Sequence, residues 1–99
     1  MPHAIRFAAS IKRQLRDLPA QRRSVVLDAI EVQLTHEPLV ETRNRKPLRP
    51  NPIAPWELRV GSLRVFYEVS SEESGIVNIL ALGEKDGNVL RIAGKEIKL

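Results

Sequence analysis

The sequence predicts an α+β fold, in which a helical hairpin packs on a mainly antiparallel four-stranded sheet in the order β-α-α-β-β-β. Three observations predict it. Apolar residues recur at helical spacing in residues 11–36, strand-like apolar runs occupy residues 56–82, and prolines interrupt the stretch between them. A length of 99 residues and a hydrophobic content of 42% suit a single domain over residues 1–99.

The first third of the chain predicts a strand and two helices. Residues 3–8 alternate apolar and other side chains, as in a first strand. Ser10 is the expected N-cap of the first helix. The apolar positions of that helix are Ile11, Leu15 and Leu18. Pro19 ends it and suits the first turn of a second helix at about residues 20–36. Because the link is so short, we expect the two helices to be antiparallel.

The remaining segments predict a loop followed by strands. Five prolines in residues 37–55 predict a loop without regular structure that crosses from the helices to the sheet. Residues 76–82 are apolar at all positions but one, which is typical of a central strand covered on both faces. A turn is expected at residues 83–88. Residues 89–99 alternate again and predict an extra C-terminal β-hairpin.

Residues 56–69 are the most informative stretch, because they predict two strands joined by a two-residue turn. Gly61 allows the positive φ that the first position of a type II′ turn requires. Arg59 and Arg64 then lie on opposite strands close to the turn. A tight hairpin with two guanidinium groups suits an anionic ligand. The alternative for Arg64 is an ordinary cross-strand ion pair with Glu57 or another acid.

The charge of the chain is unevenly distributed around a net value of +4. Residues 1–23 hold six Lys or Arg against one acid, residues 24–42 hold four acids and no Lys or Arg, and residues 43–64 again hold six against one. Two basic blocks that meet in space give a cationic face, as in phosphate-binding proteins. The alternative is a solvated surface without a partner.

Composition also sets limits on other functions. The chain contains no cysteine, which excludes disulfides and thiolate metal sites and makes the cytoplasm the expected compartment. No apolar run approaches the roughly 20 residues of a membrane span, so no membrane partner is expected.

The element order and the pattern Trp-x-Leu-Arg-Val-Gly-x-x-Arg-Val-x-Tyr at residues 56–67 resemble the RelE/ParE toxins of bacterial type II toxin–antitoxin systems. The resemblance covers about residues 4–85, and the final hairpin lies outside it. It implies that a cognate antitoxin binds and inactivates the protein, with a higher-order toxin–antitoxin complex as a further expectation. RelE-like members inhibit translation by cutting messenger RNA on the ribosome, whereas ParE-like members inhibit DNA gyrase without being nucleases.

For the nuclease, the resemblance implies catalytic roles for three residues. Arg64 matches the arginine that contacts the scissile phosphate, and Arg59 matches a basic residue on the preceding strand. Lys85 lies where the family commonly carries Arg or Lys, and would transfer a proton or bind the phosphate. Cleavage through the 2′-hydroxyl needs a base, a cation and an acid, so no metal and no cofactor are expected. The alternatives without a functional role are that Arg59 is an ordinary exposed strand arginine and that Lys85 is an ordinary turn lysine.

Other basic residues would bind the RNA backbone. These are Lys46, Arg49 and Arg45 on the proline-rich loop, together with Arg91 near the end of the chain. The chain departs from the nuclease pattern in two ways. Glu57 stands where the nucleases have a lysine, and the late tyrosine of the family is missing. Two alternatives therefore stay open: a gyrase inhibitor, and a weakly toxic protein that still binds its antitoxin.

Two aromatic residues in the stretch 56–69 are expected to pack in the protein rather than to take part in RNA binding or catalysis. Trp56 is expected to pack under the helices rather than to stack on a base. Tyr67 is expected in the core or at the sheet edge rather than at a catalytic position.

Overall fold

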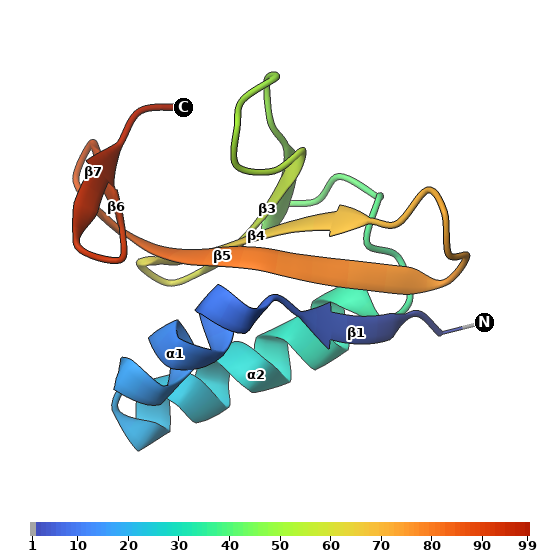
Figure 1. Cartoon of the computed structure of the whole chain (residues 1–99), viewed down its shortest axis with the longest axis horizontal. Helices are drawn as coiled ribbons and strands as arrows, with labels where there is room; N and C mark the ends of the chain where they lie inside the picture. The colour runs from blue at the N-terminus through green and yellow to red at the C-terminus, as the bar shows by residue number, and fades with distance from the viewer. Residues whose placement is uncertain (1) are drawn as a thin grey trace.

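The computed structural model of the protein describes residues 2–99, and it shows two helices packed on one face of a seven-stranded sheet (Figure 1). The elements are β1 (Ala4–Phe7), α1 (Ala9–Asp17), α2 (Ala20–Leu34), β2 (Arg45–Pro47), β3 (Trp56–Val60), β4 (Leu63–Val69), β5 (Ile76–Asp86), β6 (Val89–Ile92) and β7 (Lys95–Ile97). The sheet order is β2-β3-β4-β5-β6-β7, and β1 pairs with β5. The predicted fold class is thereby confirmed, with more strands than expected.

β5 is the strand around which the sheet is built. One of its sides pairs with β4 along most of its length. The other side is shared: β1 pairs in parallel with its first part, and β6 pairs antiparallel with its last part. Between β1 and β6, the side chain of Gln14 accepts a hydrogen bond from the Leu82 N–H at 2.9 Å. The expected turn at residues 83–88 was therefore wrong in its start, because pairing with β6 keeps the strand extended to Asp86.

The proline-rich segment is more regular than predicted. Arg45–Pro47 forms the edge strand β2, so the expectation of no regular element in residues 37–55 was wrong. Pro47 is tolerated because it is the last residue of an edge strand, where a missing N–H leaves the ladder intact. Residues 48–55 form an ordered loop, which the Leu48 N–H closes by donating to the Pro55 carbonyl at 2.8 Å.

The helices begin and end close to the predicted positions, but the first one is not capped as predicted. α1 begins at Ala9 with Ala8 as the N-cap residue and no side-chain cap. The Ala8 N–H donates to the Ile79 carbonyl, so strand β1 leads directly into the helix. Ser10 already lies in the first turn, and the N-cap prediction for it was wrong.

The main hydrophobic core lies between the helices and the sheet. Its helical residues include Ile11, Val26 and Ile30. Tyr67 is fully buried there, its hydroxyl donates to the Pro38 carbonyl at 2.6 Å, and burial raises its pKa far above the usual range. Trp56 packs against Tyr67 with ring centroids 6.2 Å apart. Both aromatic residues therefore serve packing.

A second cluster lies on the face of the sheet opposite the helices. Its buried residues are Ala54, Phe66, Ala81 and Leu90. Residues 48–55 and the β6–β7 hairpin supply the side chains that pack on it, and both segments rise on that side of the sheet (Figure 1). Within residues 2–99, no helix, strand or loop lies over the part of β3, β4 and β5 between them (Figure 1), although Phe66 and Ala81 are buried there.

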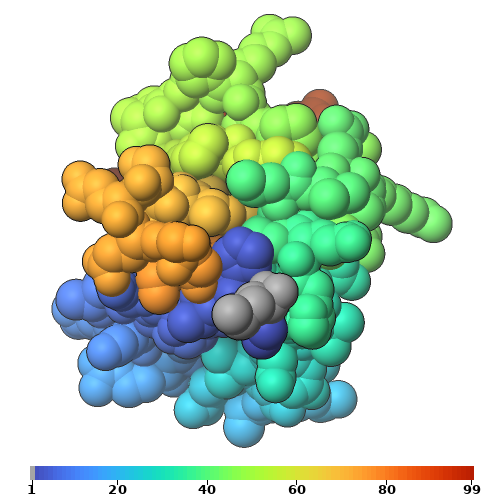
Figure 2. Space-filling view, turned by 90° about the vertical axis from the view of Figure 1, so that its right-hand side faces the viewer, coloured from blue at the N-terminus to red at the C-terminus, as the bar shows by residue number. Residues whose placement is uncertain are grey.

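The end of the molecule near the N-terminus is closed by polar contacts. The turn at residues 70–75 lies beside the start of β1 there (Figure 2). Arg6 and Glu73 form a bidentate ion pair across this junction, at 2.9 and 3.1 Å. Within residues 2–99, no helix is long and apolar enough to cross a membrane.

Candidate functional site

The strand register collects cationic side chains on the face opposite the helices. One cross-strand row holds Arg59, Arg64, Gly83, Ile92 and Lys95, and the next holds Lys46, Glu57, Phe66 and Ala81. Phe66 and Ala81 belong to the second cluster, which fixes the face on which both rows lie. We name the charged part of this face, formed by Lys46, Glu57, Arg59, Arg64 and Lys85, the open face.

Two arginines form the centre of the open face. Arg59 and Arg64 are directly opposite each other in the β3–β4 ladder, next to a turn in which Gly61 has a φ of 59°. The turn expected from the sequence is therefore present, and it forces the two guanidinium groups together. Like charges in directly opposed positions repel, so this pair requires a nearby counter-charge.

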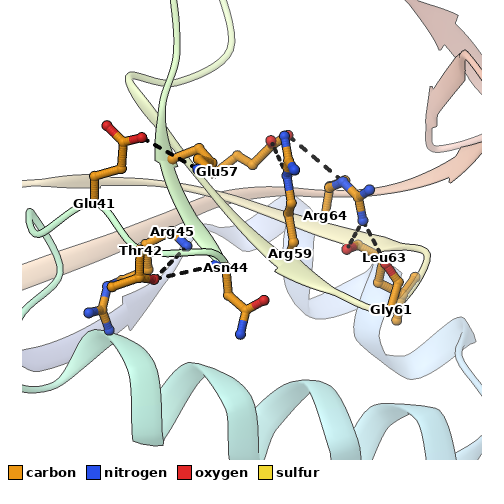
Figure 3. Close-up of polar contacts among 10 residues, drawn as sticks. Glu41, Thr42, Asn44, Arg45, Glu57, Arg59, Gly61, Leu63 and Arg64 are labelled. Atoms are coloured by element: carbon orange, nitrogen blue, oxygen red, sulfur yellow. Dashed lines mark hydrogen bonds and ion pairs between the residues drawn. The ribbon is translucent and has the colours of Figure 1, made fainter.

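Glu57 supplies that counter-charge. Its Oε2 lies 3.1 Å from Nε of Arg59, and its Oε1 lies 4.0 Å from Nε of Arg64 (Figure 3). The Glu57 side chain is only 10% exposed. The carboxylate therefore lies buried between the two arginines, and the cross-strand ion pair considered as an alternative for Arg64 is present.

The two arginines differ in how firmly their side chains are held and in how exposed they are. Nη1 of Arg64 donates to the carbonyls of Gly61 at 2.7 Å and Leu63 at 3.0 Å, and the side chain is 14% exposed (Figure 3). Arg59 is 44% exposed and uses only its Nε within residues 2–99. Arg64 is thus fixed by the turn that it follows, while the Nη atoms of Arg59 are available to a ligand.

Two further predicted residues, Lys85 and Lys46, lie near this pair, and a third, Arg49, lies on the loop at residues 48–55. The backbone N–H of Lys85 donates to the Ser62 carbonyl at 2.8 Å, and strand alternation places its exposed side chain on the open face. Lys46 lies opposite Glu57, with its Nζ 3.4 Å from Oε2 of Glu41. Arg49 is exposed on the loop at residues 48–55.

Arg45 does not join them. Its side chain is buried, with the whole residue 7% exposed. Nη1 donates to the backbone carbonyl and the side-chain Oε1 of Gln33, and Nε donates to the Val40 carbonyl. Arg45 therefore satisfies a free carbonyl near the end of α2, and its predicted RNA-binding role is corrected to a structural one.

Arg91 does not join them either. It lies opposite Glu84 on one neighbouring strand and Glu96 on the other. Strand alternation places all three on the sheet face that carries the helices, so the structure does not place Arg91 with the arginine pair.

Sequence reasoning missed one basic residue on the sheet face opposite the helices. Lys95 lies in the same cross-strand row as Arg59 and Arg64, at the far end of that row. The alternation of residues 89–97 gives this signal, because it places Lys95 on one face with Leu90 and Ile92.

A polar contact on the helix side anchors the β3–β4 turn. Nη2 of Arg22 donates to Oε2 of Glu84 at 2.9 Å and to Oγ of Ser62 at 3.4 Å. The hydrogen bond from Arg22 lowers the pKa of Glu84. Within residues 2–99, no group of three or more His, Asp or Glu side chains is placed to hold a metal ion.

Comparison with known proteins identifies the family. The sequence matches no protein-family model. It is 31% identical to Toxin RelG of Mycobacterium tuberculosis (strain ATCC 25618 / H37Rv) over 77 residues, which cover 78% of this chain and 85% of RelG. The chain belongs to the RelE/ParE toxin superfamily. A chain of the toxin–antitoxin complex RelBE2 from Mycobacterium tuberculosis matches this RelE/ParE protein with a TM-score of 0.69 and 29% identity, over 86% of this chain and 100% of that one.

Proposed function

We propose that this RelE/ParE protein is a toxin that inhibits translation by cutting messenger RNA on the ribosome. The observation that carries the proposal is the opposed pair Arg59 and Arg64, which lies between Lys46 and Lys85 on the sheet face opposite the helices. Four cations on one face suit a polyanionic chain that passes over the sheet.

Each residue has a role in the proposed cleavage. The 2′-oxygen attacks the adjacent phosphorus, the bond to the 5′-oxygen breaks, and a proton moves from the former oxygen to the latter. Arg64 and Arg59 neutralise the charge that builds on the phosphate oxygens. Lys85 is the proposed proton-transfer group or second phosphate ligand. Lys46, Arg49 and Lys95 position the RNA backbone.

We also propose an antitoxin as the partner that inactivates the protein in the cell. The support is the likeness to a chain from RelBE2, which is a toxin–antitoxin complex. Co-expression with the product of a neighbouring gene, followed by co-purification, tests this part of the proposal.

Purified protein in an in vitro translation reaction tests the nuclease. We expect synthesis to stop and primer extension to show discrete cuts in the translated message. Arg64→Ala should lower the cleavage rate about 100-fold or more, because one preorganised donor at an anionic transition state contributes that much. The control is Arg16→Ala, which removes an exposed arginine from α1. Absence of cuts with the wild type, or equal rates for the two variants, contradicts the proposal.

Two observations favour a second candidate, a gyrase inhibitor. Glu57 neutralises half of the arginine pair, and the one tyrosine of the chain is buried in the core rather than at the open face. A protein of this kind should block supercoiling by purified gyrase while translation continues. Rapid arrest of translation without any effect on gyrase excludes it.

A further inference from the structure

We infer that Glu57 is the positioning residue of the arginine pair, and that it holds the Arg59 guanidinium group beside Arg64 in the orientation in which the pair meets a phosphodiester. The nature of this ligand rests on the proposed function. The orientation itself rests on contacts within the protein. Glu57 lies on β3 in the cross-strand row next to the one that contains both arginines.

The contacts place the carboxylate behind the guanidinium groups rather than in front of them. Glu57 approaches both arginines at Nε, the atom nearest the aliphatic chain. The Nη atoms of Arg59 have no protein acceptor within residues 2–99. A phosphate can therefore bind at the Nη edge without displacing Glu57. A carboxylate that mimicked the ligand would occupy the outer edge and would be exposed, whereas this one is 10% exposed.

Charge explains why such a group is needed. Arg59 and Arg64 contribute +2 and Glu57 contributes −1, so the cluster carries +1. Without Glu57, two cations would face each other across one ladder position, and they would separate. Arg64 would keep its bonds to the Gly61 and Leu63 carbonyls, but Arg59 would lose the one side-chain acceptor that it has within residues 2–99. The arginine pair would then keep its positive charge, but the Arg59 guanidinium group would no longer be held in one orientation.

Positioning and charge predict opposite effects of one substitution. Glu57→Gln raises the charge of the open face, so RNA should bind more tightly and with a steeper dependence on salt. Cleavage should become slower, because the guanidinium groups no longer share one orientation. A residue that serves only folding would lower both quantities together.

The matched control is Glu41→Gln. Glu41 pairs with Lys46 beside the open face, does not contact either arginine, and its replacement changes the net charge equally (Figure 3). With a 2′-O-methyl RNA that cannot be cut, we expect about two- to fivefold tighter binding at low salt for both variants. In single-turnover cleavage on ribosomes, Glu57→Gln should be at least about tenfold slower, while Glu41→Gln stays within about twofold of the wild type. Equal cleavage by the two variants, or joint loss of binding and cleavage in Glu57→Gln, overturns the inference.

A second measurement is independent of activity, so it separates failure of this inference from failure of the nuclease proposal. The Nε–H signals of Arg59 and Arg64 in the NMR spectrum of the free protein report their orientation. We expect resolved, slowly exchanging signals in the wild type. In Glu57→Gln, the Arg59 signal should move to the position of solvated arginines and exchange at least about tenfold faster. If both signals are unchanged, Glu57 does not position the pair.

Discussion

At the scale of single residues, burial decides which cationic side chains can meet a ligand. Arg45 and Arg59 lie on the neighbouring strands β2 and β3, yet one is 7% exposed and the other has a side chain that is 44% exposed. The first donates to the Gln33 and Val40 carbonyls, and the Nη atoms of the second have no protein acceptor within residues 2–99. The same functional group therefore stabilises the fold in one place and forms the proposed site in the other.

This difference gives a prediction for Arg45. Arg45→Lys should destabilise the protein by about 1.5–3 kcal/mol, because one ammonium group cannot reach the Gln33 and Val40 acceptors in the geometry of the guanidinium. Unfolding in urea measures the loss. RNA binding by the folded variant should remain equal to that of the wild type, and a large loss of binding with unchanged stability would contradict the structural role.

Sequence reasoning could find the arginine pair but not the fate of Arg45. The opposition of Arg59 and Arg64 follows from local turn chemistry, since a two-residue turn at Gly61 fixes the register of both strands. The burial of Arg45 depends on where the end of α2 lies in space. Nothing in the neighbouring residues separates Arg45 from the exposed Arg43.

At the scale of elements, the β6–β7 hairpin depends on one residue of β5 that has no side chain. A Cβ at Gly83 would lie 3.0 Å from Cγ1 of Ile92 and from Cδ1 of Leu90, and 3.1 Å from the Arg91 carbonyl oxygen. The hairpin can therefore fold closely over β5 only because residue 83 is glycine. Since Gly83 also lies opposite Arg64, this packing borders the open face.

Gly83→Ala should consequently cost about 1–3 kcal/mol, the usual range for overpacking, and should loosen β6 more than β4. Urea unfolding gives the first quantity, and amide exchange of the two strands gives the second. A double-mutant cycle with Ile92→Ala removes one of the two closest contacts and should show favourable coupling. Additive effects would show that the Ile92 contact does not cause the loss.

The elements that sequence reasoning misplaced were those whose pairing partner was not yet known. Residues 83–86 contain glycine and charged side chains, which locally favour a turn. They are extended because β6 returns to pair with them. The short strand β2 is similar, since its three residues become a strand only by pairing with β3.

At the scale of the whole molecule, the two faces of the sheet have different tasks. The helices seal one face with the main core, and the other face is only partly covered (Figure 1). This division was predictable, because an amphipathic helix has one apolar side, and the two helices bury that side against the same face of the sheet. The side on which the C-terminal hairpin folds was not predictable, because its alternation fits either face.

Ion pairs between segments far apart in the sequence make the free energy of unfolding depend on pH. The Arg22 hydrogen bond lowers the folded pKa of Glu84 below its unfolded value of 4.5. This contribution is therefore present above about pH 4.5 and is lost as the pH falls through the lowered folded pKa. Both side chains are substantially exposed, so it should amount to about 0.5 kcal/mol or less.

Glu84→Gln tests this contribution in urea unfolding at stepped pH values. The variant should be slightly less stable than the wild type at pH 7, and the difference should disappear in strong acid. Glu72→Gln is the control, since Glu72 is an exposed glutamate outside the recorded ion pairs of residues 2–99. A difference that persists after protonation would have to come from packing.

β1 and β6 pair with different parts of the same side of β5, and this arrangement affects how the protein unfolds locally. The first part of this strand is bordered by a segment from the beginning of the chain, and the last part by a segment from its end. Between the two borders, the Leu82 N–H of β5 donates to the Gln14 side chain of α1. We therefore expect a fluctuation that releases the C-terminal hairpin to leave the register of the first half intact, because β4 still pairs with β5 there. The Arg64–Gly83 pair lies in the half of β5 that β6 borders.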